Sequence, residues 1–173
     1  MTQLARFRIP AEIALACLAA YVIGFQVTAL FPGYLPKIGG LWSAISAVVV
    51  TQSTRQETTS QASLRMLGSA IGAITSAAYL LLLPFHPLGM AVVIFATVTI
   101  CTALRIPSHA RLAAITVLVV MVTASFDPRL NPLLNALLRL IESGIGTGVA
   151  VLLVRLWPGS HRGEGIRTGA GRD

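Results

Sequence analysis

Arg139 and Glu142 form the pair of ionisable residues whose spacing most favours chemistry. Residues three apart on a helix share one face, so the guanidinium and the carboxylate can pair with each other or point into one cavity. Both lie in the apolar stretch 134–157, which predicts Arg139 at the outer boundary of a membrane span and Glu142 about one turn inside it. Charge within a span is costly and therefore points to function. A structural ion pair at the interface is the alternative.

Arg65 is the second candidate cation, next to the apolar stretch 67–84. An arginine beside a helix N-terminus adds a full charge to the positive dipole end and to free amides, and this combination favours anions. The competing interpretation is that Arg65 only follows the tendency of basic residues to collect on the cytoplasmic side. That interpretation does not apply to Arg139, which falls on the other side.

Three further side chains are candidates for the path of a solute or a proton. Trp42 lies near the outer end of the second apolar stretch, and Gln52 belongs to the polar residues that close it. Gln52 can bond a solute or simply end a helix. Glu12, one turn into the first stretch, is a candidate for proton coupling together with Glu142; the alternative for Glu12 is a contact with headgroups or an arginine.

Small residues recur four apart in two stretches, at Gly68 and Gly72 and again at Gly144 and Gly148. This spacing lets one helix backbone approach another closely, so we predict helix packing at these positions. A role in lining a pore is the alternative.

The elements that carry these residues are membrane helices. The 173 residues are 55% hydrophobic and 11% charged, whereas soluble domains carry roughly 25% charged residues. A membrane helix needs about 20 mostly apolar residues, and prolines separate stretches of nearly that length. We therefore predict an all-α membrane protein with six transmembrane helices, at about 11–30, 39–53, 67–84, 88–105, 110–126 and 134–157.

Basic residues predict the orientation, because short cytoplasmic loops collect Lys and Arg. One set of loops and ends holds only Lys37, Arg129 and Arg139, and the other set holds the remaining arginines. Both termini are therefore predicted in the cytoplasm: residues 1–10 as a short N-terminus, 11–158 as the transmembrane domain and 159–173 as a mobile tail. The scattered basic residues also exclude nucleic acid as a partner, despite a net charge of +7.

The two halves of the chain resemble each other. Residues 41–74 align with 115–148, with identities that include Arg65 with Arg139, Ser69 with Ser143 and Gly72 with Gly146. Three spans per half is an odd number, so the halves form inverted repeats, an architecture in which secondary transporters place their binding site between the repeats. The apolar cores of the second and fifth helices are also short, which points to a solute pathway or, alternatively, to tilted or interfacial helices.

No enzyme motif, catalytic residue, metal cluster or cofactor signature is present in the sequence, so we predict that the protein is not an enzyme.

The stretch Trp42–Gln52 (WSAISAVVVTQ), then Arg65, Gly68 and Gly72, and finally Arg139, Glu142 and Gly146 with the closing Leu156–Pro158 resemble the fusaric acid resistance and aromatic acid exporter superfamily. Plant aluminium-activated malate channels look like distant relatives. The resemblance covers most of residues 11–158, and Arg65 and Arg139 match the family's arginines at the starts of the third and sixth helices.

The resemblance implies a multi-pass protein of the bacterial inner membrane that exports organic, often aromatic, carboxylates. Larger members carry a cytoplasmic domain or a second membrane module, so a single small module is expected to act as a homo-oligomer, with a dimer favoured. A passive anion channel and a non-transporting accessory subunit are the alternatives. Besides the organic anion, membrane lipid is the expected partner.

Overall fold

The computed structural model describes residues 3–52, 54–127 and 129–156, without the side chains of 3–6 and 8. The predicted tail 159–173 lies outside these residues. The described part of the chain consists of six helices and their connections: α1 (Gln3–Ala29), α2 (Pro36–Val50), α3 (Arg55–Leu82), α4 (Pro87–Ala103), α5 (Pro107–Phe126) and α6 (Pro132–Leu156).

The helix starts follow from proline and capping residues. Pro36, Pro87 and Pro107 stand in the first turns of α2, α4 and α5, where a missing amide costs nothing. The Thr54 hydroxyl accepts a hydrogen bond from the Glu57 amide at 3.2 Å and caps α3. These residues explain why the interruptions predicted from the sequence coincide with the observed connections.

Helix α3 begins at Arg55, about three turns before the predicted span at 67. Residues 55–66 are too polar for a hydropathy criterion, yet they carry a buried stripe with helical spacing at Thr58, Ala62 and Arg65. This stripe packs against the bundle and extends the helix. Arg65 therefore lies about 15 Å along the axis from the helix start, and the prediction that it flanks the N-terminus was wrong.

Among the described residues, four helices are long and apolar enough to cross a membrane: α1 over Ile9–Ala29, α3, α5 and α6. Helices α2 and α4 are apolar but shorter, with 15 and 17 residues. The sequence predicted short second and fifth helices. The second is short, but α5 has 20 residues because Pro107 opens an additional polar turn before the apolar core.

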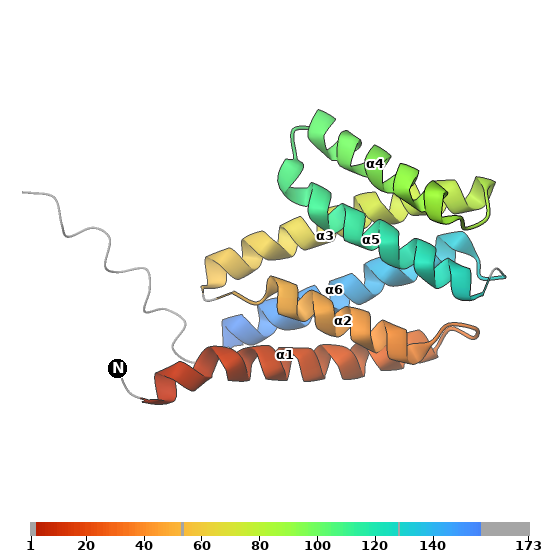
Figure 1. Cartoon of the computed structure of the whole chain (residues 1–173). Helices are drawn as coiled ribbons and strands as arrows, with labels where there is room; N and C mark the ends of the chain where they lie inside the picture. The colour runs from red at the N-terminus through yellow and green to blue at the C-terminus, as the bar shows by residue number, and fades with distance from the viewer. Residues whose placement is uncertain (1–2, 53, 128, 157–173) are drawn as a thin grey trace, which may run out of the picture.

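The helices pack side by side in one bundle, with α1 along one edge and α4 along the opposite edge (Figure 1). Helix α1 packs on α2 and α6, and α4 packs mainly on α5. Helices α3 and α6 contact each other at the centre and run in opposite directions. The pairs α2 with α6 and α3 with α5 complete the core around them. The candidate site residues of α3 and α6 thus lie at the middle of the molecule.

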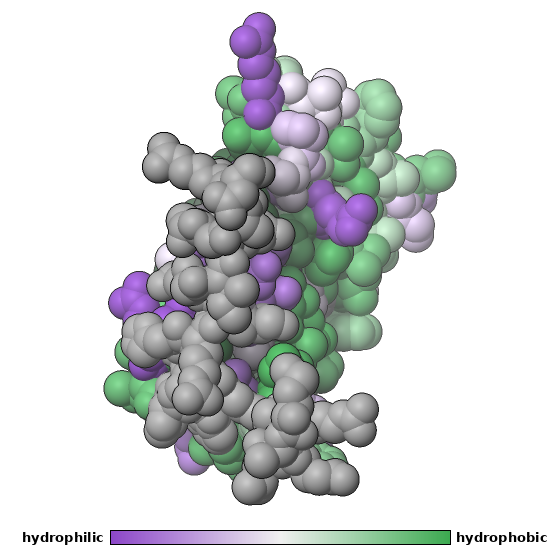
Figure 2. All heavy atoms as spheres, turned by 90° about the vertical axis from the view of Figure 1, so that its left-hand side faces the viewer, coloured by the Kyte–Doolittle hydropathy of each residue, from purple (hydrophilic) through white to green (hydrophobic). Residues whose placement is uncertain are grey.

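The distribution of side chains is the reverse of that in a soluble protein. Large apolar residues such as Leu82, Leu88 and Phe95 are 72–83% exposed, while buried positions hold many serines, threonines and alanines together with Arg65, Arg139 and Glu142. Hydrophobic atoms cover much of the flank visible when the molecule is viewed along the helices (Figure 2). Such an exterior is stable in lipid, where apolar surface costs nothing.

Candidate functional site

The centre of the candidate site is an ion pair buried in α6. Arg139 is 1% exposed and Glu142 is fully buried. The Arg139 Nη2 atom donates a hydrogen bond to Glu142 Oε1 at 2.8 Å, and Nη1 lies 2.8 Å from Oε2. The spacing predicted that the two side chains either pair with each other or point into one cavity, and in the structure they pair. The predicted positions of both residues were nearer the helix end than the observed ones. Helix α6 begins at Pro132, so Arg139 lies two turns inside it.

Two neighbouring helices complete the surroundings of the Glu142 carboxylate. The Thr28 hydroxyl of α1 donates a hydrogen bond to Oε1 at 2.8 Å, across 114 residues of sequence. Gly39 of α2 leaves the room that the carboxylate occupies, because a Cβ at this position would lie 2.7 Å from the same oxygen. The ion pair is therefore held by three helices, and neither Thr28 nor Gly39 was identified from the sequence.

Arg65 of α3 is fully buried but has different neighbours. Its Nε and Nη2 atoms donate hydrogen bonds to the Ser46 hydroxyl at 3.2 and 3.0 Å. The guanidinium carbon lies 4.9 Å from the ring centroid of Trp42, within the range of a cation–π interaction. Among the described residues, no carboxylate forms an ion pair with Arg65. Its burial also argues against the interpretation that it is only a loop-flanking positive charge.

The two arginines lie on opposite sides of the point where α3 and α6 cross. Ser69 donates a hydrogen bond to the Ser143 hydroxyl at 3.2 Å, and each serine follows its arginine by four residues. Because the helices are antiparallel, Arg65 and Arg139 are separated by about eight residues, or about 12 Å, along the helix axes. The two cations therefore lie at different depths of the bundle.

Arg139 borders a cavity of about 220 Å³ at the end of the bundle where α6 begins. Its other walls include Tyr34, Thr123 and Asp127. Tyr34 lies in the turn between α1 and α2, where burial raises the pKa of its phenol while the charge of Arg139 acts in the opposite direction. The cavity thus has a cationic, a phenolic and an acidic group in its walls.

A second cavity of about 230 Å³ lies between α2 and α5 and is almost entirely apolar. Trp42 forms part of its wall, with the Arg65 guanidinium over the Trp42 ring. Ile38, Thr123 and Phe126 line both this cavity and the one at Arg139, so the two are adjacent. We call this pair of adjacent cavities the α2–α5 groove. It reaches Arg139 directly and approaches Arg65 through the Trp42 ring.

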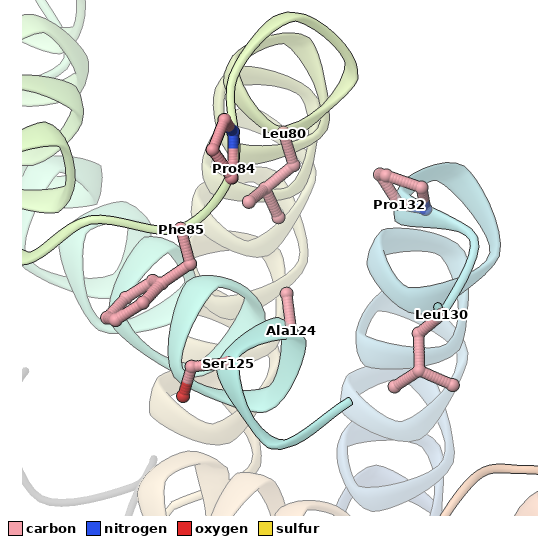
Figure 3. Close-up of a pocket in the computed structure, with 7 residues that line it drawn as sticks. All are labelled: Leu80, Pro84, Phe85, Ala124, Ser125, Leu130 and Pro132. Carbon is pink, nitrogen blue, oxygen red and sulfur yellow. The ribbon is translucent and has the colours of Figure 1, made fainter. Parts of the chain in front are cut away.

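A third cavity, of about 200 Å³, lies at the same end of the bundle as Arg139. Figure 3 shows Leu80 and Ala124 on one side of it and Leu130 and Pro132 on the other. Its lining is apolar except for Ser125, and it contains no charged side chain. This cavity could therefore fit an apolar solute, but it has no group that would recognise a charge.

The other predicted site residues fall into two groups. Gln52 follows α2, and its side-chain amide donates a hydrogen bond to the Val49 carbonyl at 3.3 Å, so it closes that helix. Glu12 is 3% exposed in α1. Neither residue lines the α2–α5 groove. The structure therefore pairs Trp42 with Arg65 and Arg139 with Glu142, whereas neither Gln52 nor Glu12 lines the groove.

The glycines that were predicted to pack helices together also fall into two groups. A Cβ at Gly68 would lie 2.8 Å from Leu112 Cβ, and one at Gly72 would collide with the Ala113 carbonyl. By contrast, Gly144 has only ordinary contacts with Met66, and Gly148 has no neighbour within 4 Å, so no close helix contact within this chain occurs at these two. The close approach in α6 occurs at the intervening glycine, Gly146.

Gly146 faces α2, where an added Cβ would collide with the Ser43 carbonyl. A spacing rule alone overlooked this residue. The signal that could have found it was the alignment of the two halves, which pairs Gly146 with Gly72. Ser46 could not have been found in this way, because its role depends on how α2 rests against α3.

In the described part of the chain, no group of three or more His, Cys, Asp or Glu residues is placed to hold a metal ion. The chemistry of the site is therefore that of two buried guanidinium groups, one carboxylate, an indole and several hydroxyls. Guanidinium groups bind carboxylates through paired N–H donors. The arrangement suits the binding of organic anions.

The apolar exterior and the long apolar helices define a multi-pass membrane protein. The family described as fusaric acid resistance protein-like matches residues 15–153, so the chain belongs to this family. The resemblance seen in the sequence is thereby confirmed. Members of the family are membrane transporters rather than enzymes. Neither curated proteins nor solved structures show a match to this chain.

Proposed function

We propose that the protein exports organic carboxylates, aromatic ones in particular, through the α2–α5 groove. The observation that carries this proposal is Arg65, a fully buried guanidinium without a carboxylate partner among the described residues. An unpaired buried charge is costly, so such a residue needs a compensating ligand. A solute carboxylate beside the Trp42 ring would supply negative charge near Arg65, which does not itself line the groove.

Trp42 supports the preference for aromatic solutes. Its ring forms part of the wall of the apolar cavity, and its indole Nε1 has no hydrogen-bond partner among the described residues. A flat ring in the groove can stack on an aromatic side chain, and a carboxylate can accept the free N–H. Arg139 at the other end of the groove provides a second cationic group along the same route.

An inverted repeat is part of this proposal. Ser69 and Ser143, which align between the halves, contact each other at the crossing, as expected for residues near a two-fold axis. The closest contacts of Gly72 include Ala113 and Thr116 in α5, and those of Gly146 include Ser43 and Ser46 in α2. Gly72 of the first half thus faces two residues three apart on α5 of the second half. Gly146 of the second half likewise faces two residues three apart on α2 of the first half.

We also propose how the protein is oriented in the membrane and how it assembles. We place the protein in the bacterial inner membrane, with both termini in the cytoplasm, from the distribution of basic residues. We favour a homodimer because the α2–α5 groove is open and apolar along α2 and α5. A second copy facing the groove would separate the solute from lipid. The mass of the purified protein in detergent, measured by light scattering, tests the dimer.

Transport is tested with the full chain reconstituted in liposomes loaded with radiolabelled benzoate. We expect protein-dependent benzoate efflux that falls at least about tenfold in Arg65→Gln, because the buried positive charge is lost. Arg129→Gln is the matched control, since Arg129 is an exposed arginine in the α5–α6 connection. No efflux above that of empty liposomes, under any imposed proton gradient, would end the exporter proposal. Currents without a coupled gradient would indicate the channel alternative.

A further inference from the structure

The two aligned arginines differ in what neutralises them. Three residues after Arg139 stands Glu142, whose carboxylate pairs with it, whereas three residues after Arg65 stands Gly68. Among the described residues, the hydrogen bonds of the Arg65 side chain go to a hydroxyl, and its guanidinium lies over an aromatic ring. One half of the chain thus carries a built-in carboxylate at the position where the other half has none.

The Glu142 carboxylate occupies the place that a solute carboxylate would take on Arg139. Both of its oxygens lie 2.8 Å from a terminal guanidinium nitrogen, the arrangement by which arginine binds carboxylate ligands. The fit is incomplete: the Nη1–Oε2 contact lacks hydrogen-bond geometry, and the Arg139 Nε–H has no partner in the described part of the chain. Arg139 therefore retains donors for a competing anion.

An incoming anion has access to this arginine. Arg139 borders the 220 Å³ cavity together with Tyr34 and Asp127. Glu142 does not line this cavity, and its carboxylate contacts Thr28 of α1 and lies close to Gly39 of α2. Besides Arg139, the titratable side chains that line this cavity are those of Tyr34 and Asp127. A solute in the cavity and the carboxylate of Glu142 would thus compete for one cation.

We propose that Arg139 is an exchange site, which holds the Glu142 carboxylate at rest and a solute carboxylate when Glu142 is protonated. In the exchange, a proton from water binds Glu142, its two contacts with Arg139 break, and the solute oxygens form equivalent contacts. The net charge at Arg139 is the same before and after, so no unpaired charge is left buried. Release of the solute outward returns Glu142 to Arg139 with loss of its proton.

This inference rests on the proposed function, since it uses the same groove and the same class of solute. It also goes further, because it links one bound anion to one bound proton through a single residue. Thr28 suits both states: its hydroxyl donates to the carboxylate and can accept from the neutral acid.

The test is a measurement of proton uptake by the purified full chain in detergent, in weak buffer with a pH-sensitive dye, on addition of sodium benzoate. We expect the wild type to take up protons as benzoate binds. Glu142→Gln should take up none and should bind benzoate roughly tenfold more tightly, because no internal carboxylate competes for Arg139. Glu57→Gln, which changes an exposed acid in α3, is the matched control and should behave as the wild type.

Proton uptake that persists in Glu142→Gln, or that disappears in Glu12→Gln instead, would overturn the exchange site. If Glu142→Gln does not yield folded protein, the wild type decides: benzoate binding without proton uptake contradicts the inference. Liposome efflux separates the two proposals. Efflux with the same pH dependence in wild type and Glu142→Gln refutes the exchange site alone, whereas no efflux from any variant refutes the exporter.

Discussion

Ser69 and Ser143 contact each other through their side-chain oxygens, 3.2 Å apart, at the crossing of α3 and α6. Both side chains are fully buried, and the two residues align between the halves of the chain. The helices can approach closely here because both residues are small. This contact sets the separation between the two buried arginines, each of which lies one turn away.

We expect the crossing to depend on the size of Ser69 more than on its hydrogen bond. Hydrogen bonds between membrane helices contribute about 0.6 kcal/mol on average, so Ser69→Ala should change stability by less than about 1 kcal/mol. Ser69→Leu adds volume at a close contact and should destabilise the protein by about 1–3 kcal/mol. Unfolding in mixed detergent measures both, and equal effects of the two substitutions would contradict this account.

Two glycines of α6 provide a matched pair. Gly146→Ala should destabilise the protein by about 1–3 kcal/mol, because the new Cβ meets the backbone of α2 at Ser43. Gly148→Ala has open space and should be neutral or stabilising by up to about 1 kcal/mol, since alanine favours a helix over glycine. Thermal unfolding of the two variants in the same detergent checks the difference. If Gly148→Ala were instead the more destabilising variant, α6 would pack through the face that carries Gly148 and not through the face that carries Gly146.

The ion pair in α6 should show strong coupling between its members. Glu142→Leu leaves Arg139 buried and without its ion-pair partner, which should cost about 3–5 kcal/mol. Adding Arg139→Met should recover most of this loss, because two apolar side chains of similar size replace the pair. A double-mutant cycle of unfolding free energies gives the coupling. Additive effects would mean that the residues do not interact in the membrane.

Trp42 should determine the choice between aromatic and aliphatic carboxylates. Trp42→Phe keeps a ring in the groove and should retain a preference for benzoate over butyrate, whereas Trp42→Leu should reduce that preference about threefold to tenfold by removing stacking of about 0.5–1.5 kcal/mol. Competition efflux from liposomes with both solutes gives the ratio. Similar ratios in Trp42→Leu and wild type would place the solute away from this ring.

Some features of the candidate site could be predicted from the sequence and others could not, for physical reasons. The shared helix face of Arg139 and Glu142 followed from their spacing, because residues three apart on any helix are neighbours. Thr28 lies 114 residues away from Glu142, and no local pattern connects them. For the same reason, the contact of Gly146 with Ser43 and Ser46 could be recognised only once α2 was in place.

The sequence by itself determined that lipid surrounds the helices, approximately where the helices lie, and which family the chain belongs to. Hydropathy and proline positions are read along the chain, and lipid demands continuous apolar helices wherever the chain crosses it. The tertiary structure decided which faces turn inward: it placed Arg65 deep in α3 against Trp42 and Ser46, and it closed Glu142 between three helices. Those relations depend on the rotation and crossing of helices, which arise from packing between distant segments.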